Sequence, residues 1–579
     1  MLKLARYQGL LHGKQPSYPI LSALSQVRLY STDLAPPRKK AYVTTPIFYV
    51  NAAPHIGHLY SMILADTIHR YWILRGMDSI FATGTDEHGL KIQQAAAKKS
   101  ISSQKLCEDV SRTFRELAKA GNIQYTDFIR TTEPRHKVAV QTLWNQLLDK
   151  GYIYKGHHEG WYSVSDEAFY AENQVVPGTD PVTKEPCKVS IDTGNRVEWH
   201  SEENYKFRLS SMVPRLERWL QDNPRVIQPV ERYNEVLASL ATSTSDLSIS
   251  RPAHRLSWGI PVPNDPSHTI YVWMDALTNY LTVTGYPHED PNSADYQGHW
   301  PVHTHLVGKD IIRFHSVFWP AFLMAADLPL PKRILAHAHW TMDKAKMSKS
   351  RGNVASPHEL LEALGQDGAR FYMVRDGGIA NDADYSMDMA FRRYKKELAG
   401  QLGNLLSRST SSALNPTGTI PPGIDLLHGA PEKPLEGPQE EVEELYTSIS
   451  LLPSLYEKCM EEGHPGKAVA AIFDMLAKAN RYFSACTPWK LQGTPEKEAQ
   501  RDRVVWWSME ACRTAGILLL PVMPERSSRL LDLLGVPLSR RHWKDLGVER
   551  GWGREGIPSR DQSPIPLPPS EVLFPPKKA

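Results

Sequence analysis

Two short motifs combine residue types that can bind a nucleoside triphosphate. The first is His55-Ile56-Gly57-His58, which stands between an expected strand and an expected helix. The free N–H groups and partial positive charge of a helix N-terminus suit a phosphate, and two histidines three residues apart lie on one helix face. Gly57 leaves space for a base or ribose against the backbone. Taken alone, the tetrapeptide could equally be a helix cap, because the chain has 22 histidines.

The second motif is the run Lys346-Met347-Ser348-Lys349-Ser350, which continues into a polar stretch with a glycine. Lys346 and Lys349 could both approach a triphosphate and neutralise charge on a leaving pyrophosphate. Alone, this run could be a solvated basic loop or a nuclear-import tract. Because both motifs occur together, in this order and after strands, they strongly favour a single phosphate site.

Alternating strands and helices must position these motifs. Strands rich in β-branched and aromatic residues are expected at 41–50 and 79–89, with a helix at 59–76 between them. The same rhythm returns with strands at 304–310 and 333–340. This order predicts a parallel sheet covered by helices, with the site at the carboxyl ends of the strands.

Composition sets limits on the class of protein. The 579 residues are too many for one core and suggest two to four domains. No apolar run approaches the roughly 18 residues that span a bilayer, so no membrane is expected as a partner. The five cysteines include no CxxC pair, which argues against a disulfide framework and against a cysteine zinc site.

The first 32 residues carry four basic residues, and no acidic residue precedes Asp33. Such a composition is typical of mitochondrial transit peptides, although a disordered tail is the alternative. Without these four charges the formal net charge of +3 falls to about −1 (3 − 4). Nucleic-acid binding must therefore come from local basic surfaces and specific contacts.

The text around the motifs narrows the interpretation further. The segments TTPIFYVNAAPHIGH, GTDEHG, DLSISR, WGIPVP, VWMDALTNY, VGKDIIRFH and KMSKSRGN follow one another over roughly 41–410. With them the chain resembles the methionyl-tRNA synthetases of the mitochondrial, bacterial-like kind, and weaker agreement runs on to about 490. Its HIGH and KMSKS motifs are those of the class I aminoacyl-tRNA synthetases.

The resemblance implies a methionine–tRNA ligase for mitochondrial translation. It would form methionyl-adenylate from L-methionine and ATP with Mg²⁺, release pyrophosphate, and transfer methionine to the 3′-terminal adenosine of tRNA(Met), releasing AMP. A monomer in the mitochondrial matrix is expected. Because the methionine carboxylate is the nucleophile, positioning and charge stabilisation supply the rate without a side-chain general base. The resemblance implies catalytic roles for His55, His58, Lys346 and Lys349, and ATP contacts for these four residues, Gly57 and Ser348.

The methionine site follows from the same resemblance. Asp86, in GTDEHG, matches the acid that binds the methionine ammonium, with a helix-capping Asp as the alternative. A thioether is apolar and polarisable and favours aromatic contacts. Read without the family, Trp273 and Tyr280 would be taken as core, since seven residues separate them. The resemblance assigns the site to Ile47, Tyr49, Asp86, Trp273, Ala276, Leu277, Tyr280, Ile311 and His315.

Three further positions match residues that read the CAU anticodon: Asn404, Arg408 and Trp489. Asn and Arg offer base-edge hydrogen bonds and Trp offers a stacking face, although an exposed Asn and Arg on a helix are often simply solvated. Four residues separate Asn404 from Arg408, which places both on one helix face. Arg251, in DLSISR, matches an arginine with a conformational or ATP-linked role.

The predicted fold is α/β: a split Rossmann-like parallel sheet with an inserted connective domain, followed by an all-α anticodon-binding bundle. The expected parts are a transit peptide (1–33), the first catalytic half (40–154), the insertion (155–217), the second half (218–340), the KMSKS loop and linker (341–390), the helical domain (391–545) and an irregular tail (546–579).

Two departures from the family pattern stand out. Many relatives carry CxxC zinc knuckles in the insertion, whereas this insertion contains only Cys187. Four ligands are needed for a tetrahedral site, so no structural zinc is predicted, and the aromatics Trp161, Tyr162, Phe169 and Tyr170 are expected to hold the insertion instead. Ala338 and His339 stand before KMSKS where relatives often have a glycine and a second aromatic.

Other functions remain as alternatives. Another class I synthetase is one, but cysteine enzymes bind their substrate thiol through a zinc site that this sequence lacks. A synthetase-derived, non-catalytic RNA-binding protein would not need both phosphate motifs. A small-molecule nucleotidyltransferase would not need the helical domain.

Overall fold

The computed structural model describes most of the chain, and Lys39–Ala579 forms one compact unit. The expected transit peptide, Ser348 and Lys349 lie outside the described residues, and of Lys346 the backbone alone is described. The described residues are 39–163, 168–170, 172–180, 185–191, 193–240, 245–287, 298–347, 355–421, 439–547, 566–569 and 571–577.

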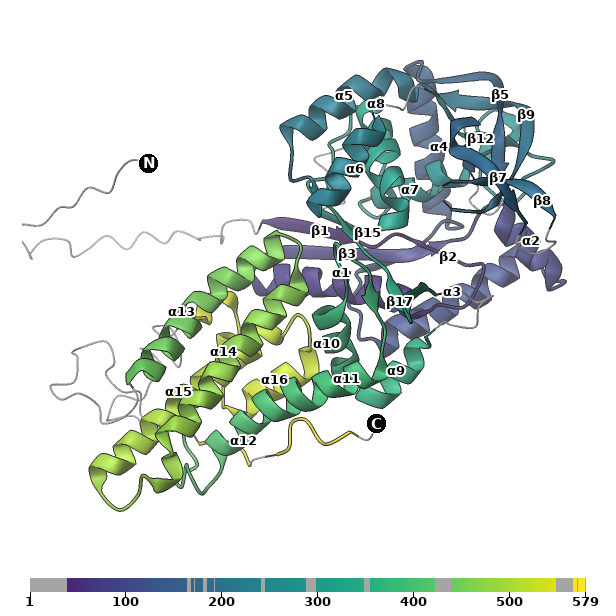
Figure 1. Ribbon diagram of the computed structural model, residues 1–579. Helices are drawn as coiled ribbons and strands as arrows, with labels where there is room; N and C mark the ends of the chain where they lie inside the picture. The colour runs from purple at the N-terminus through teal and green to yellow at the C-terminus, as the bar shows by residue number, and fades with distance from the viewer. Residues whose placement is uncertain are drawn as a thin grey trace, which may run out of the picture. The chain divides into compact units, whose positions relative to one another are not determined.

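A seven-stranded sheet forms the centre of the catalytic part (Figure 1). Its order is β10-β16-β15-β1-β3-β2, with β4 also paired to β3, and every pair is parallel. β1 and β15 are neighbours although the insertion separates them in sequence, which is the split sheet that the sequence predicts. The strands are β1 (Lys40–Thr44), β2 (Phe48–Tyr49), β3 (Asp78–Asp86), β4 (Asp127–Arg130), β10 (Ile227–Gln228), β15 (Thr304–Gly308) and β16 (Ile334–His337).

Side chains of this sheet alternate between two hydrophobic cores. Val43 and Phe81 face one core, whereas Tyr42 and Ala82 face the other. Helices cover both faces, as a parallel sheet requires. The helices of this part are α1 (Ile56–Leu74), α2 (Leu90–Lys98), α3 (Ser103–Ala120), α4 (Pro134–Asp149), α5 (Leu209–Asp222), α6 (Val230–Leu240), α7 (Val272–Thr282) and α8 (Trp319–Ala325), with a 3-10 turn at Lys309–Ile311 and a π-helix at Phe314–Phe318 before α8.

The insertion is an antiparallel sheet of order β6-β5-β9-β8-β7, to which β11 also pairs. Its small core contains Tyr170, Val175 and Val197, with Trp161 packed against them. The rings of Tyr162 and Phe169 lie 4.9 Å apart. The strands are β5 (Ile153–Ser163), β6 (Ala168–Tyr170), β7 (Val175–Thr179), β8 (Pro186–Ser190), β9 (Arg196–Phe207) and β11 (Leu247–Ser248), with a 3-10 turn at Glu172–Gln174.

Two further sheets have three strands each. One has the order β12-β14-β13 and the other β18-β17-β19. The second sheet contains the start of the KMSKS motif, because β18 includes Lys346. The strands are β12 (Ser250–Pro252), β13 (Pro261–Val262), β14 (Asp265–Ile270), β17 (Trp340–Met342), β18 (Ala345–Lys346) and β19 (Ala383–Asp384).

The C-terminal part is helical, and α13, α14 and α15 lie side by side (Figure 1). A π-helix at Tyr394–Gly403 connects α11 to α12. Arg392, Lys396, Gly400 and Asn404 are all exposed, so one solvent-facing stripe runs along this connection. The helices are α9 (Pro357–Leu364), α10 (Gln366–Asp376), α11 (Met387–Arg393), α12 (Asn404–Thr410), α13 (Gln439–Glu461), α14 (Pro465–Cys486), α15 (Pro495–Leu519) and α16 (Pro524–Leu533), with 3-10 turns at Pro488–Lys490, Leu538–Arg540 and Trp543–Asp545.

Arg370 of α10 connects these parts. Its guanidinium is fully buried and lies 2.6 Å from the Asp66 carboxylate of α1. It also donates to the carbonyls of Gly121, Pro521 and Val522, at 3.1, 3.0 and 2.8 Å.

The split parallel sheet, the inserted sheet and the helical C-terminal part confirm the predicted fold class. Across the described helices, none is both long and apolar enough to cross a bilayer.

Candidate active site

A cavity of about 450 Å³ lies at the carboxyl ends of four central strands. Its walls come from the residues that follow β1, β3, β15 and β16, together with the first turns of α1 and one face of α7. This is the position that a parallel sheet predicts for a ligand site. The lining includes Pro46, Ile47, Phe48, Tyr49, His55, Ile56, Gly57, His58, Tyr60, Ser61, Asp86, Lys91, Val272, Trp273, Ala276, Leu277, Tyr280, Gly308, Asp310, Ile311, His315, His337, Ala338, His339, Trp340 and Met347.

The first motif begins α1, and its histidines cap the helix. His55 is the N-cap, and its Nδ1 accepts a hydrogen bond from the Gly57 N–H at 3.1 Å. Nδ1 of His58 accepts from the His55 N–H at 3.0 Å, and the two ring centroids are 3.8 Å apart. A neutral ring that accepts at Nδ1 carries its proton on Nε2. Capping uses Nδ1 of each ring and leaves the proton on Nε2, so capping and phosphate binding are chemically compatible.

Gly57 is required by this close approach of the histidine ring. A Cβ at position 57 would lie 2.9 Å from Cε1 of His55, which is shorter than real contacts of this kind. Any larger residue would push the His55 ring away from the first turn of α1. The glycine therefore holds the ring arrangement as well as opening the backbone.

All nine residues that the resemblance assigns to methionine line the same cavity. Trp273, Ala276, Leu277 and Tyr280 stand on one face of α7 at helical spacing. Tyr49 of β2 pairs with Asp86 of β3 across the sheet edge. The structure thus brings the set together with the histidine pair, while the role of each residue stays a prediction.

A hydrogen-bonded pair closes the apolar end of the cavity. Nε2 of His315 lies 2.7 Å from the hydroxyl of Tyr280, and its Nδ1 lies 3.0 Å from the carbonyl oxygen of Ile311. Because Nδ1 must donate to the carbonyl, the Tyr280 hydroxyl donates to Nε2. Burial lowers the pKa of His315 to about 4 and raises that of Tyr280. Both groups are uncharged at neutral pH, which suits an apolar, polarisable ligand atom.

Several lining residues escaped the sequence interpretation. His339 lies 3.1 Å from an Asp310 carboxylate oxygen, and His337 lies 2.8 Å from the Ser61 hydroxyl. Burial lowers the pKa of His337 to about 4. Their position in the sequence could have identified them, because His337 ends β16 and His339 follows it, at the edge of the sheet where the site was expected. Met347 is the part of the second motif whose side chain the structure places at the cavity.

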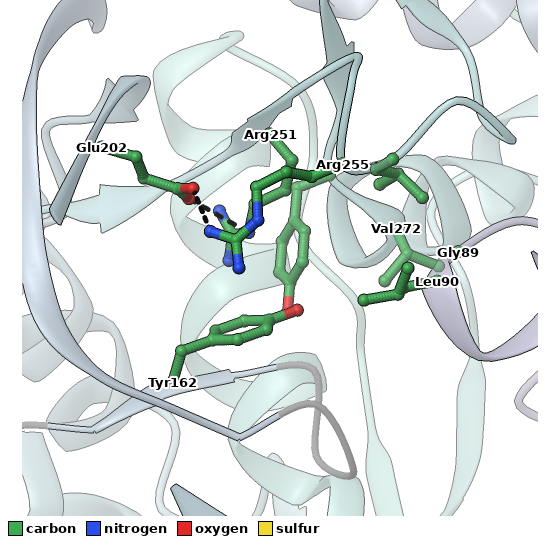
Figure 2. Close-up of a pocket in the computed structure, with 9 residues that line it drawn as sticks. Gly89, Leu90, Tyr162, Glu202, Arg251, Arg255 and Val272 are labelled. Atoms are coloured by element: carbon green, nitrogen blue, oxygen red, sulfur yellow. Dashed lines mark hydrogen bonds and ion pairs between the residues drawn. The ribbon is translucent and has the colours of Figure 1, made fainter. Parts of the chain in front are cut away.

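Arg251 lies in a separate, smaller cavity of about 20 Å³ between the insertion and β12 (Figure 2). Its guanidinium lies 4.1 Å from the centroid of the Tyr271 ring, and its Nη1 donates to the Ser248 hydroxyl at 2.8 Å. Figure 2 shows Arg251 and Arg255 directed at Glu202, which bonds Arg255 at 2.8 Å. Val272 lines both cavities, so the two are adjacent. The structure does not bring Arg251 into the larger cavity.

The three residues assigned to the anticodon lie in the helical part. Arg408 is half-buried, donates to the Asn480 side chain at 2.7 Å and stands 4.4 Å from the centroid of the Phe483 ring. Trp489 is 49 % exposed, and its ring centroid is 6.5 Å from that of Phe483. Asn404 is exposed one turn before Arg408. Phe483 thus joins Arg408 to Trp489, a contact that the sequence did not indicate.

A split parallel sheet with a HIGH motif at the start of its first helix is found in the class I aminoacyl-tRNA synthetases, and the family comparison agrees. The family model described as tRNA synthetases class I (M) matches residues 41–410. A probable mitochondrial methionine–tRNA ligase of Neurospora crassa is 46% identical over 539 residues, covering 91% of this chain and 86% of the relative. The mitochondrial methionine–tRNA ligase of Homo sapiens is 44% identical over 516 residues, covering 88% and 86%.

Solved structures agree with these relatives. Mycobacterium tuberculosis methionyl-tRNA synthetase in complex with methionyl-adenylate superposes with a TM-score of 0.83 at 38% identity, covering 93% of this chain and 100% of that one. The chain belongs to the methionyl-tRNA synthetase family.

The buried histidines predict a loss of stability in mild acid. The folded pKa of His315 and of His337 is about 4, against roughly 6.5 in an unfolded chain. The contribution of these neutral histidines to the free energy of unfolding is fully present above pH 6.5. It is lost as the pH drops toward 4, because the unfolded chain then binds protons that the folded chain does not bind. We expect each of them to lower the free energy of unfolding by about 2 kcal/mol at pH 5. The melting temperature measured from pH 7.5 to 5 checks this.

His69 provides a test outside the cavity. Burial also lowers its pKa to about 4, and its Nδ1 lies 2.9 Å from the Ser79 hydroxyl. A His69→Gln variant should show a smaller fall in melting temperature between pH 7.5 and 5 than the unaltered chain. A melting temperature that stays constant over this range would contradict the expected titration of the buried histidines.

Proposed function

We propose that this chain is a methionine–tRNA ligase of mitochondria that forms methionyl-adenylate from methionine and ATP and then charges tRNA(Met). One observation carries the proposal: the nine side chains assigned to methionine and the histidine pair of the first motif line one cavity. Membership in the methionyl-tRNA synthetase family supports it. Each of these groups has a step in the reaction.

In the first step, a methionine carboxylate oxygen attacks the α-phosphate of ATP. An oxygen–phosphorus bond forms, the bond to the β-phosphate bridge breaks, and pyrophosphate leaves with its electron pair. His55 and His58 donate their Nε2–H groups to phosphate oxygens, and Lys346 and Lys349 neutralise charge that develops in the transition state. No proton needs to be removed from the nucleophile, so positioning supplies much of the rate.

Mg²⁺ fits this chemistry as a companion of the ATP phosphates. Among the described residues, no group of three or more His, Cys, Asp or Glu side chains could hold a metal ion. Phosphate oxygens and water are ligands that Mg²⁺ prefers. The ion would therefore arrive with ATP and supply charge neutralisation there.

The same cavity distinguishes the two ends of methionine. Asp86 is the group for the α-ammonium, since it is a carboxylate at the carboxyl end of β3. The α7 face and the neutral Tyr280–His315 pair receive the thioether, which prefers aromatic, uncharged surroundings. In the second step, a ribose hydroxyl of the 3′-terminal adenosine of the tRNA attacks the methionyl carbonyl carbon, and AMP leaves.

Compartment, assembly and metal content belong to the same proposal. The basic, acid-free segment before Asp33 acts as a transit peptide to the matrix, and the enzyme works as a monomer. It requires no structural zinc, because the insertion has a single cysteine and packs Trp161 and Tyr170 against Val175 and Val197. Metal analysis of the purified, active chain should find less than about one zinc per ten molecules, since a structural site would be nearly filled. Zinc bound in equal amount, and lost together with activity on chelation, would contradict this part.

The test of the activity is ATP–pyrophosphate exchange by the chain without its first 32 residues, with each amino acid supplied singly. Methionine should support exchange. Lys349→Ala should lower the rate roughly 100-fold with little change in methionine affinity, because the lysine acts on the transition state.

Lys344→Ala is the matched control, since Lys344 is exposed in the turn between β17 and β18 and should leave exchange unchanged. Exchange with a different amino acid would keep the class and overturn the substrate. A folded chain that exchanges with none would favour the RNA-binding alternative.

The helical part predicts a separable effect on tRNA. Removing a base-stacking ring costs about 1–3 kcal/mol, so Trp489→Ala should raise the KM for tRNA(Met) roughly 5- to 150-fold. Methionine-dependent ATP–pyrophosphate exchange should stay unchanged, because the ring lies outside the cavity. Aminoacylation kinetics measure both.

Tyr446→Ala serves as the control for a comparable exposed ring in the same part. Tyr446 is 41% exposed on α13. Its replacement should change neither the KM for tRNA(Met) nor methionine-dependent ATP–pyrophosphate exchange. An equal rise in the KM for tRNA(Met) in both variants would show that general damage to the helical part, and not stacking by Trp489, causes the effect.

A further inference from the structure

A fully buried carboxylate, Asp275, stands behind the cavity. It lies on α7 between two residues that line the cavity, Trp273 and Ala276, but does not line the cavity itself. Nδ1 of His88 lies 2.6 Å from one of its oxygens, and Nε2 of His136 lies 2.8 Å from the other. Burial alone would raise the pKa of Asp275, but the two imidazoles lower it to about 2. It is therefore ionised at neutral pH.

The two histidines come from different elements. His88 follows β3 and is 3% exposed, and His136 is fully buried on α4. Nδ1 of His136 lies 2.9 Å from the hydroxyl of Thr282, two turns further along α7. One carboxylate on α7 thus links the loop after β3 and helix α4 to helix α7.

Two of these elements carry opposite ends of the methionine site. Asp86 is the last residue of β3 and leads directly into the loop, two positions before His88. Helix α7 presents Trp273, Ala276 and Tyr280. Asp275 is the immediate neighbour of Ala276, and His88 lies two positions after Asp86, so each end of the Asp275–His88 hydrogen bond is close in sequence to a residue that lines the cavity. The Asp275–His88 hydrogen bond therefore influences how far Asp86, which is assigned to the methionine ammonium, lies from the apolar residues of α7.

The loop is firmly held on its other side, which makes the bond to α7 the adjustable one. The carboxylate of Glu87 accepts from Nε of Arg130 at 2.7 Å and from the hydroxyl of Thr85 at 2.8 Å. Its carbonyl accepts from the indole N–H of Trp258 at 2.6 Å. A change at Asp275 would leave these contacts in place and shift the loop relative to α7.

We propose that Asp275 is a positioning residue that sets the length of amino-acid side chain the enzyme accepts, by fixing the distance between Asp86 and the apolar pocket on α7. The inference rests on the proposed function. A carboxylate is suited to it because both histidines donate to its two oxygens. An amide of the same shape carries no charge and turns its N–H groups toward one of these donors, so one of the two histidines must give up its hydrogen bond or change its tautomer.

The experiment compares methionine with ethionine, which is one methylene longer, in ATP–pyrophosphate exchange by the full chain. One methylene changes discrimination about 10- to 200-fold in a well-fitted pocket. In Asp275→Asn, the KM for methionine should rise about tenfold and the preference for methionine over ethionine should fall at least about fivefold. The KM for ATP should change less than about twofold, because the phosphate end of the cavity stays in place.

Glu510→Gln is the matched control. Glu510 is an equally buried carboxylate, bonded to Arg513 within α15 and outside the cavity. It should lower the melting temperature and leave both the methionine KM and the preference over ethionine unchanged. If Asp275→Asn behaves like this control, Asp275 is merely structural and the proposal is overturned.

His88→Ala keeps the test decisive if Asp275→Asn does not fold. It removes the Nδ1 donor that links the loop to α7 while Asp275 retains His136, and it should reproduce the loss of preference. A folded His88→Ala variant with unaltered preference would overturn the proposal. Failure of the unaltered chain to exchange with methionine would instead overturn the proposed function, so the two failures are distinguishable.

Discussion

The buried guanidinium of Arg370 is the interaction on which the arrangement of the described chain depends. Removing such a charge from water costs several kcal/mol, and the cost is offset only when every donor finds a partner. Here the Asp66 carboxylate and the carbonyls of Gly121, Pro521 and Val522 supply them. Since Asp66 belongs to α1, the helix that begins at the histidine motif is held against the end of α15. Neither can move without leaving the buried guanidinium of Arg370 short of a hydrogen-bond partner.

Much of the catalytic fold could be predicted because its signals are local. Strands such as β1 and β3 are buried on both faces, so they appear as continuous runs of β-branched and aromatic residues. The methionine residues were a different matter. Tyr280 is 1% exposed and Leu277 is 2% exposed, so a cavity wall and a core have the same hydropathy and the same helical spacing. Only the resemblance to a family separated them.

The pairs that give the site its geometry could not be predicted from the sequence. Asp275 and His88 are 187 positions apart, and Asp275 and His136 are 139 apart. Each is a short polar contact inside the protein, and nothing in the neighbouring residues marks its partner. Phe483 beneath Arg408 has the same character, since its ring belongs to another helix. Local patterns predict elements, whereas contacts of this kind follow only from the way the elements pack.

The π-helix at Tyr394–Gly403 has a consequence for how the chain can change in length. A π-helix turns less per residue than an α-helix, so positions four apart fall short of a full turn, whereas in an α-helix they run past one. Arg392, Lys396, Gly400 and Asn404 follow this spacing and are all exposed. Deleting one residue here would let the segment relax to an α-helix and rotate everything beyond it by about 100°. The number of residues between the linker and α12, more than their identity, therefore sets the direction in which Asn404 and Arg408 point.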